Sequence, residues 1–344
     1  MNYPPAIRVN NLHFPCILML GCLLNSFTLA GDLPQPKFVL EWGKKGNQPG
    51  EFYSPIGLAF NAKDELFVTD LNNARVQKFT TAGEFVAAFN LPRDNPERKS
   101  TIIGGIVIDD AGLLYLSFMI QHKIGVYSQS GDQVREWGQR GEKAGQFHQP
   151  GGLLFTPDGN LLVADQCNHR LQKFTRAGKL LAQWGGYGTE PGQFDGIGTK
   201  GSRFGGPHFV AQDSKGRIYT TEGFQGRVQQ FSPTGEFLAQ WGDKGDQPGG
   251  FGAYQFGNLP QSVGPIGIHI DRYNRVYVSS LNDRVQCFDT SGKYQFGIEG
   301  TGLENGSLLH PHGMVFDSHD CLYIADAGNQ RIVKFEVPPP PEAK

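Results

Sequence analysis

A short segment recurs six times along this chain, and this repeat constrains the fold more than any other feature of the sequence. The copies are LFVTDLNNARVQKF (66–79), LYLSFMIQHKIGVY (114–127), LLVADQCNHRLQKF (161–174), IYTTEGFQGRVQQF (218–231), VYVSSLNDRVQCF (276–288) and LYIADAGNQRIVKF (322–335). Their basic residues, Arg75, Lys123, Arg170, Arg227, Arg284 and Arg331, follow one another at intervals of 47 to 57 residues. An interval of this length is typical of one blade of a β-propeller.

Each copy belongs to a longer unit with a fixed order of elements. An apolar segment such as GGLLF (151–155) precedes a turn such as Pro157-Asp158-Gly159, and the LxVxD and RVQKF segments follow. A second turn leads to a last segment that usually ends in Trp-Gly. Alternating apolar residues bounded by Gly and Asp are typical of strands joined by tight turns, and no segment has a helical period. The sequence therefore predicts an all-β fold: a six-bladed β-propeller of four-stranded antiparallel blades.

The two ends of the repeat region predict how the ring closes. The last copy ends at RIVKF (331–335) without a fourth strand, whereas KFVLEWG (37–43) is a fourth strand without the other three. Pairing the two removes free strand edges, which otherwise invite aggregation. We therefore expect the propeller to span 31–337, with residues 38–42 as the outer strand of the last blade and 338–344 as a Pro-rich C-terminal tail.

The pattern D-x-x-N-x-R-[VIL]-x-x-F inside the copies resembles the NHL-repeat family. The best matches are Asp165, Asn168, Arg170 and Asp326, Asn329, Arg331. The resemblance covers about residues 37–336, and the period and the Trp-Gly strand ends agree with it. It implies the propeller fold, but it says little about function because propellers host many activities.

Residues that recur in blade after blade are expected to be structural. Asp165 ends one strand and Arg170 begins the next, so the hairpin brings the two side chains within hydrogen-bonding distance. Trp42, Trp137, Trp184 and Trp241 share one repeat position, and we expect them to pack between blades. A functional site needs its residues only once.

Departures from the repeat are better candidates for a site. The loops at 186–207 and 243–265 are longer than their counterparts, and long loops on a rigid scaffold often carry binding sites. The strand order places these loops and the Asp-to-Arg loops on one face, which opens onto the central channel. The ligand-face candidates are Tyr187, Phe194, Arg203, Phe204, Tyr254, Phe256, His148 and Phe118; Phe118 stands where most other copies have an acidic residue.

Two histidines occupy the same position in different blades, His208 after Pro207 and His312 after Pro311. This Pro-His pair resembles the peptidyl-hydroxyglycine alpha-amidating lyases, an NHL-like family in which histidines at the propeller mouth bind zinc. The resemblance implies a zinc site at His208 and His312, and calcium is the other metal ion that we consider. The third histidine is missing, because Gly104 occupies the remaining alternate blade. The alternative is that both histidines contact polar ligands or water.

The N-terminus predicts export. An apolar run from Phe14 to Leu24 precedes Thr28 and Ala30, which fits a signal peptide over 1–30 cleaved after Ala30. Processing as a lipoprotein at Cys22 is the alternative. Cys167, Cys287 and Cys321 are the remaining cysteines, too few for a disulfide framework. The expected location is periplasmic or extracellular, with no transmembrane span in the mature chain.

Charge narrows the range of partners. The chain has 31 basic and 33 acidic residues, which gives no electrostatic footprint for nucleic acid. We expect a monomeric binding module that holds a peptide, glycan or protein through its loop-rich face. The alternative is a metal-dependent lyase or hydrolase with zinc near the two histidines.

Overall fold

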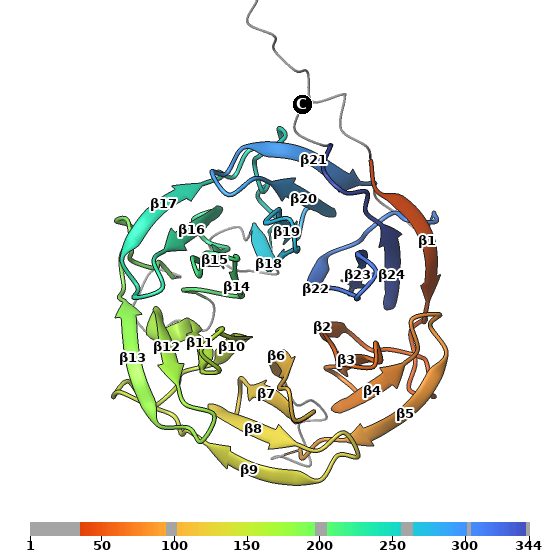
Figure 1. Ribbon diagram of the computed structural model, residues 1–344, viewed down its shortest axis with the longest axis horizontal. Helices are drawn as coiled ribbons and strands as arrows, with labels where there is room; N and C mark the ends of the chain where they lie inside the picture. Colours follow the sequence, from red (N-terminus) through yellow and green to blue (C-terminus); the bar gives the residue numbers. More distant parts are fainter. Residues whose placement is uncertain (1–34, 94–101, 197–204, 256–263, 301–303, 342–344) are drawn as a thin grey trace, which may run out of the picture. The chain divides into compact units, whose positions relative to one another are not determined.

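Six separate antiparallel sheets of four strands stand around a central axis (Figure 1). The computed structural model describes residues 35–93, 102–196, 205–255, 264–300 and 304–341. In five sheets the strands follow one another outward from the axis in chain order, and the sixth sheet combines β1 with β22, β23 and β24. The predicted six-bladed, all-β propeller is therefore confirmed.

The strands of the first three blades are given from the axis outward. Blade 1 consists of β2 (Pro55–Phe60), β3 (Leu66–Asp70), β4 (Arg75–Phe79) and β5 (Phe85–Asn90). Blade 2 consists of β6 (Ile103–Ile108), β7 (Leu114–Phe118), β8 (Lys123–Tyr127) and β9 (Gln133–Trp137). Blade 3 consists of β10 (Pro150–Phe155), β11 (Leu161–Asp165), β12 (Arg170–Phe174) and β13 (Leu180–Gly185), with the 3₁₀ turn η2 (Gln166–Asn168) between β11 and β12.

The other three blades repeat this plan. Blade 4 consists of β14 (Val210–Gln212), β15 (Ile218–Glu222), β16 (Arg227–Phe231) and β17 (Phe237–Trp241). Blade 5 consists of β18 (Pro265–Ile270), β19 (Val276–Ser280), β20 (Arg284–Phe288) and β21 (Tyr294–Glu299). Blade 6 consists of β22 (Pro311–Phe316), β23 (Cys321–Asp326), β24 (Arg331–Glu336) and, as its outer strand, β1 (Lys37–Trp42). No helix in the described ranges is long and apolar enough to cross a bilayer.

The second strand of each blade is buried because both of its faces pack against neighbouring blades. All five residues of β11 are buried, whereas no residue of β13 at the rim is buried. Every connection between the second and third strands ends on a residue with left-handed φ, which reverses the chain in few residues. These residues are Ala74, His122, His169, Gly226, Asp283 and Gln330.

The chain ends close the ring as predicted. β1 pairs antiparallel with β24, with Phe38 opposite Phe335 and Trp42 opposite Ile332. An ion pair adds to the backbone ladder, because Arg331 Nη1 lies 2.7 Å from Glu41 Oε1. The outer edge of the last blade is therefore covered by a strand from the other end of the chain.

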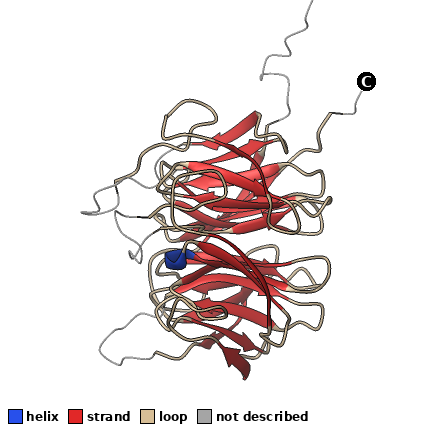
Figure 2. Ribbon diagram, turned by 90° about the vertical axis from the view of Figure 1, so that its left-hand side faces the viewer, coloured by secondary structure: helices blue, strands red, loops and turns tan. Residues whose placement is uncertain are grey.

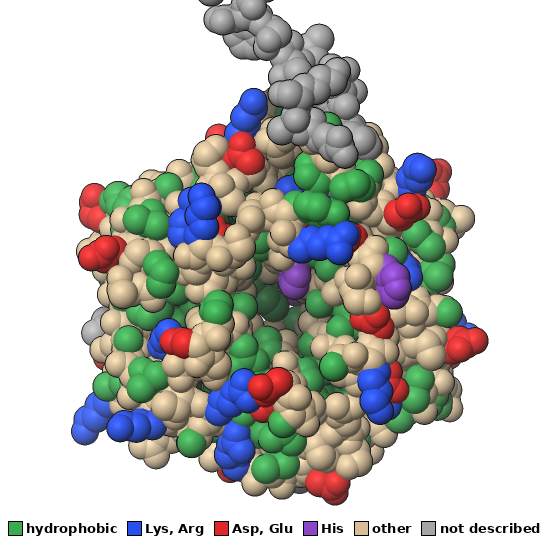
Figure 3. Space-filling view, viewed as in Figure 1, with side chains coloured by type: hydrophobic (Ala, Val, Ile, Leu, Met, Phe, Trp, Pro, Cys, Tyr) green, Lys and Arg blue, Asp and Glu red, His purple; other side chains and the backbone are tan. Residues whose placement is uncertain are grey.

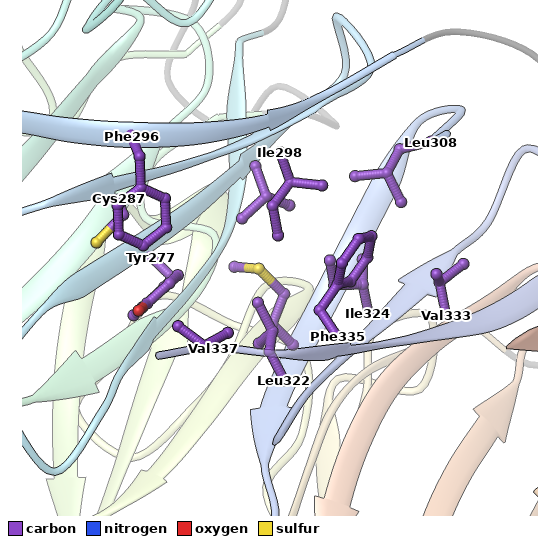
Figure 4. Packing of buried hydrophobic residues seen from close by; sticks show 12 residues of the cluster. Tyr277, Cys287, Phe296, Ile298, Leu308, Leu322, Ile324, Val333, Phe335 and Val337 are labelled. Atoms are coloured by element: carbon purple, nitrogen blue, oxygen red, sulfur yellow. The ribbon is translucent and has the colours of Figure 1, made fainter. Parts of the chain in front are cut away.

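Apolar side chains fill the space between adjacent blades. Figure 4 shows one such cluster between blades 5 and 6, which includes Phe296, Ile324 and Phe335. Burying a side chain of this size contributes roughly 1.5–3 kcal/mol relative to leaving it exposed. Val337, just beyond β24, is 3% exposed and extends the cluster. Packing of this kind holds adjacent blades together.

Five of the six inner strands have glycine at the same position, and blade 4 is the exception. The glycines are Gly57, Gly105, Gly152, Gly267 and Gly313. At Gly152 the backbone N–H donates to the carbonyl of His208 at 2.7 Å, and an added Cβ would lie 2.6 Å from Phe209 Cα. Blade 4 has Phe209 at this position, and its inner strand β14 has only three residues. The sixfold repeat is therefore broken at the top of blade 4.

Candidate functional site

The linkers between blades and the loops between second and third strands lie on one face, which we call the upper face. Leu71 N donates to the carbonyl of Ser54 at 3.1 Å, and Gly328 N donates to the carbonyl of Leu309 at 2.8 Å. In Figure 2 the coil of η2 marks this face on the left. Figure 3 looks onto the opposite face, which we call the lower face, and shows a hollow at the centre of the ring.

The repeated Asp and Arg side chains fasten the linkers of the upper face. In blade 3, Asp165 Oδ2 accepts from Arg170 Nε at 2.8 Å, and Asp165 Oδ1 accepts from the backbone N–H of His148 at 2.7 Å. The Arg170 guanidinium also donates to the carbonyls of Glu142, Lys143 and Gln146. Arg75 and Arg331 repeat this arrangement in blades 1 and 6. These residues hold the scaffold, as their repetition predicted.

A cavity of about 380 Å³ opens on the upper face where blades 5, 6 and 1 meet. We call it the upper cavity. Its lining residues are Ser54, Ile56, Leu71, Tyr254, Leu281, His310, His312, Ala327, Gly328 and Gln330. Most of this lining is apolar, and none of these residues is Lys, Arg, Asp or Glu. The cavity therefore suits an uncharged group with one or two polar atoms.

His312 presents a hydrogen-bond acceptor to this cavity. Its Nδ1 lies 2.9 Å from the carbonyl oxygen of His310. A carbonyl only accepts, so Nδ1 carries the proton and the lone pair is on Nε2. Burial lowers the pKa of His312, which keeps the ring neutral at pH 7. No described residue donates to Nε2, which leaves this nitrogen available to a ligand.

Ser54 supplies the matching donor. Its hydroxyl oxygen accepts from Asn72 Nδ2 at 2.9 Å, and the hydroxyl hydrogen has no acceptor in the described part of the chain. The amide of Gln330 is already used on both sides, because its oxygen accepts from Ser54 N and its nitrogen donates to the Ala327 carbonyl. The cavity therefore offers a ligand an acceptor at His312 Nε2 and a donor at Ser54 Oγ.

The rings of His310 and Tyr254 form one wall. Their centroids are 4.5 Å apart, and the backbone N–H of His310 donates to Asp283 Oδ1 at 2.8 Å. Tyr254 belongs to the long loop at 243–265 that the sequence singled out. This candidate is therefore placed beside the mouth of the channel, together with His312.

His208 lies deeper than His312. Its side chain is 7% exposed, and its Nδ1 is buried without a hydrogen-bond partner among the described residues. Burial, and then the repulsion that a protonated His208 would meet from a protonated His312, lower the pKa of His208 to about 4. The two imidazoles are close enough to interact, but His208 does not belong to the lining of the upper cavity.

The other candidates on this face lie over blades 2 to 4. The ring of His148 is 5.4 Å from the ring of His122, and Tyr187 is 4.9 Å from the ring of His169. His122 Nδ1 accepts from Gln149 N at 3.0 Å, so its proton is on Nε2. Tyr187 is 42% exposed and can reach a partner.

Two candidates are core residues, which corrects the expectation from the sequence. Phe194 is fully buried and packs against Phe231, because it is the Phe of the repeated GxxxGxF linker. Phe118 is 1% exposed and packs in the apolar cluster of blades 1 and 2. Arg203, Phe204 and Phe256 lie outside the described residues.

A zinc centre needs three protein ligands, and the described residues do not provide them. No group of three or more His, Cys, Asp or Glu that could hold a metal ion occurs within 35–93, 102–196, 205–255, 264–300 and 304–341. His312, with Nδ1 bonded to a carbonyl, has the arrangement of a metal ligand, but His208 contributes only a buried nitrogen. The two histidines alone do not fit a zinc site.

Comparison with known proteins agrees with the repeat. The family model of the NHL repeat matches residues 52–79, 147–174 and 308–335, which are the copies in blades 1, 3 and 6. The chain is thus a β-propeller that carries NHL repeats in three of its blades. These three blades are also the ones in which an aspartate and an arginine fasten the linker.

Two curated relatives share part of this NHL propeller. Protein brain tumor of Drosophila melanogaster is 29% identical over 102 residues, and peptidylglycine alpha-amidating monooxygenase of Rattus norvegicus is 31% identical over 102 residues. Each match covers 28% of this chain and 10% of the relative. The matched part thus spans about a tenth of the length of these relatives.

Solved structures resemble the NHL propeller over most of its length. Virginiamycin B lyase from Staphylococcus aureus has a TM-score of 0.55 at 16% identity, with 87% of this chain and 84% of that chain covered. A gluconolactonase from Xanthomonas campestris has a TM-score of 0.58 at 14% identity, with 89% and 96% covered. At this level of identity the likeness establishes the fold.

The sequence did not point to most of the upper cavity. Leu71, Leu281 and Gln330 sit in short loops at positions that vary among the copies, and they meet only because three blades converge. One signal was available: Phe209 interrupts the glycine position of the inner strands, and it packs with Phe224 and Leu281 near the cavity. The broken column of small residues thus marked blade 4, which is the neighbour of this sector.

Proposed function

We propose that this NHL propeller is a binding module that holds a peptide segment of a partner protein on its upper face, with the upper cavity as the site. The observation that carries the proposal is that one apolar, uncharged lining contains both an acceptor, His312 Nε2, and a hydroxyl donor, Ser54 Oγ. A peptide group has one N–H donor and one C=O acceptor, so it satisfies both atoms. The apolar walls receive the adjoining side chain.

Two further features support a peptide over a charged ligand. The described lining has no fixed charge, and the lowered pKa of His312 keeps that ring neutral, so phosphate or carboxylate groups gain no ion pair there. Tyr254 and Tyr187 add amphipathic rings on the same face, and such rings are common in protein interfaces. A volume of about 380 Å³ suits one side chain and its peptide group.

Selection from a random-peptide phage library on the purified propeller tests this proposal. We expect enriched peptides whose affinity falls in both His312→Ala and Ser54→Ala. His319→Ala is the matched control, because this imidazole is 79% exposed and forms no part of the cavity. Enriched peptides that bind all three variants equally would place the site elsewhere, and no enrichment over several rounds would reject peptide binding.

A lyase or hydrolase activity is the second candidate, and the bare Nε2 of His312 favours it. With Nδ1 fixed by the His310 carbonyl, Nε2 could act as a general base toward a group in the cavity. The similar structures include a lyase and a gluconolactonase by name. The test is hydrolysis or elimination of lactones and cyclic esters by the purified protein. Activity that is abolished in His312→Ala would support this candidate, and no turnover of these substrates by the wild type would reject it.

We also propose that the propeller acts outside the cytoplasm, after removal of residues 1–30. The basis is the apolar run from Phe14 to Leu24 followed by Thr28 and Ala30. The mass of the mature protein from its natural host tests this. Cleavage after Ala30 supports a soluble exported protein, a diacylated Cys22 supports a lipoprotein, and an intact N-terminus rejects export by cleavage.

A further inference from the structure

The central channel contains a second cavity, which is separate from the upper cavity. It has a volume of about 380 Å³, and its lining comes from the inner strands of all six blades. It shares no lining residue with the upper cavity. Figure 3 shows the hollow at the centre of the ring on the lower face, with hydrophobic side chains inside it. This space, which we call the channel cavity, therefore opens away from the site of the proposed function.

The channel cavity is rich in apolar and aromatic side chains. Phe60, Phe155 and Phe209 line it from three different blades, and aliphatic residues fill most of the remaining wall. No Lys, Arg, Asp or Glu is among its described lining residues. A charged ligand would lose its hydration there without gaining an ion pair, whereas an aromatic ligand would gain contact with several rings.

Two polar side chains interrupt this lining, and they come from neighbouring blades. His269 is on β18 in blade 5, at a position where the other blades have Ala59, Val107, Leu154, Ala211 and Val315. Gln212 ends β14 in blade 4. The repeat gives no structural reason for either residue, because the apolar residues at the equivalent positions complete their blades without them.

Both side chains keep hydrogen-bonding atoms free. Gln212 Nε2 donates to the carbonyl of Gly216 at 2.7 Å, and its Oε1 accepts nothing from the described residues. His269 has its ring 5.6 Å from that of Phe316, and neither of its nitrogens bonds to a described residue. Burial lowers the pKa of His269 to about 4, so at neutral pH the ring is uncharged and one nitrogen is a bare acceptor. Two acceptors thus face the same apolar space.

We propose that the channel cavity is a second ligand site, which takes a small uncharged aromatic molecule that carries an N–H or O–H donor. The ring system of the ligand packs among Phe60, Phe155 and Phe209, and its donor reaches His269 or Gln212. A volume of about 380 Å³ is within the range of roughly 300–1,000 Å³ typical of small-molecule sites. This site does not depend on the peptide-binding proposal.

Fluorescence titration with N-phenyl-1-naphthylamine tests the proposal, because this probe is uncharged, aromatic and has a single N–H donor. We expect one saturable site in the full mature chain. His269→Phe keeps a ring beside Phe316 but removes the acceptor. A neutral hydrogen bond contributes about 0.5–1.5 kcal/mol, so we expect binding to weaken by roughly two- to tenfold. The matched probe 1-benzylnaphthalene, in which a CH2 group replaces the N–H, lacks the donor and should bind both proteins equally.

Leu154→Trp provides the second test, because a large ring at this half-buried position fills the cavity. We expect it to abolish binding of both probes, and an unchanged melting profile shows that the variant is folded. His319→Ala is the control for loss of an imidazole at a site that does not line the channel. Undiminished binding in folded Leu154→Trp would overturn the proposal, as would no saturable binding to the wild type. Equal weakening of both probes in His269→Phe would reject the donor requirement.

Discussion

Blades 3 and 2 follow the same four-stranded plan but differ at the two positions of the repeated Asp–Arg pair. In blade 3, Asp165 and Arg170 tie together the loop, the third strand and the carbonyls of the incoming linker. Blade 2 has Phe118 and Lys123 at these positions. Phe118 is buried in an apolar cluster, and Lys123 forms an ion pair with Glu136 on the outer strand at 2.8 Å.

The difference shows what the repeated polar network contributes. Both blades form complete sheets, so the network is not needed to make a blade. It fixes the linker, because the planar guanidinium of Arg170 satisfies three carbonyls that would otherwise be half-buried without donors. Repetition therefore marks scaffold, and the sectors that depart from it are free to carry function.

The largest effect is expected where the network meets the two ends of the chain. Blade 6 has the full network, but its outer strand is β1, and Arg331 is paired with Glu41 on that strand. Deleting residues 31–43 exposes the edge of β24 and breaks this ion pair. We expect loss of the cooperative melting transition and aggregation, measured by circular dichroism and size-exclusion chromatography.

A shorter deletion gives the control. Removing residues 31–36 leaves β1 intact, so the melting transition should be retained. A folded, monomeric 31–43 deletion would show that blade 6 is stable with three strands, and that closure through β1 is dispensable.

The next largest effect is expected when the basic residues of blades 3 and 2 are each replaced by alanine. Arg170→Ala leaves the buried carboxylate of Asp165 without its cation and should cost about 3–5 kcal/mol in the free energy of unfolding. Lys123→Ala removes a partly exposed ion pair and should cost about 0–1 kcal/mol. Urea denaturation measures both. Equal costs would show that the buried network is not what distinguishes the blades.

The repeat made the scaffold predictable from sequence. Period, strand order, ring closure and the Asp–Arg pairs each follow from residues that recur. Each blade repeats the same pattern in similar surroundings, so the pattern can be checked several times within one sequence. Phe194 was misjudged despite this signal. It shares the linker position of Phe52, Phe147 and Phe251, all of which are buried, so the repeat already identified it as a core residue.

The candidate site could be predicted only in part. His312 was singled out because it is a histidine at an inner-strand position where most blades have Ile or Gly. Tyr254 was singled out because it lies in a long loop. Ser54 and Gln330 could not be found this way, because their importance depends on a contact between blades 1 and 6, from opposite ends of the chain. Contacts of this kind form only when the ring closes in three dimensions. A local sequence pattern cannot predict which residues then meet.

His208 of blade 4 should make the stability of the protein depend on pH below neutrality. Burial lowers the pKa of His208 to about 4, compared with about 6.5 in an unfolded chain. Between these values the unfolded chain binds more protons than the folded one, so stability falls as the pH falls from about 6.5 to about 4. Above pH 6.5 this residue has no such effect.

Replacement of His208 by the residue found in blades 1 and 5 isolates its contribution. His208→Ile, which introduces the side chain of Ile56 and Ile266, should reduce the loss of stability between pH 6.5 and pH 4 by about 1–3 kcal/mol, measured by urea denaturation across that range. Other histidines with a lowered pKa, such as His122 and His269, remain in both proteins. An unchanged pH profile would mean that His208 is protonated in the folded state as readily as in the unfolded one.

The smallest effect is expected from restoring the repeat's arginine in blade 2. Arg170 is useful because an aspartate orients its Nε and the GxxxGxF linker supplies carbonyls to the other nitrogens. In blade 2, position 118 is a buried Phe and the sequence that precedes β6 lacks this linker motif. Lys123→Arg therefore exchanges one cation for another beside Glu136 and should change the free energy of unfolding by less than about 0.5 kcal/mol. Stabilisation of more than about 1 kcal/mol in urea denaturation would mean that the arginine finds acceptors without an aspartate. The arginine would then form the network without an aspartate. The difference between the two blades would be caused by the basic residue alone and not by the Asp–Arg pair.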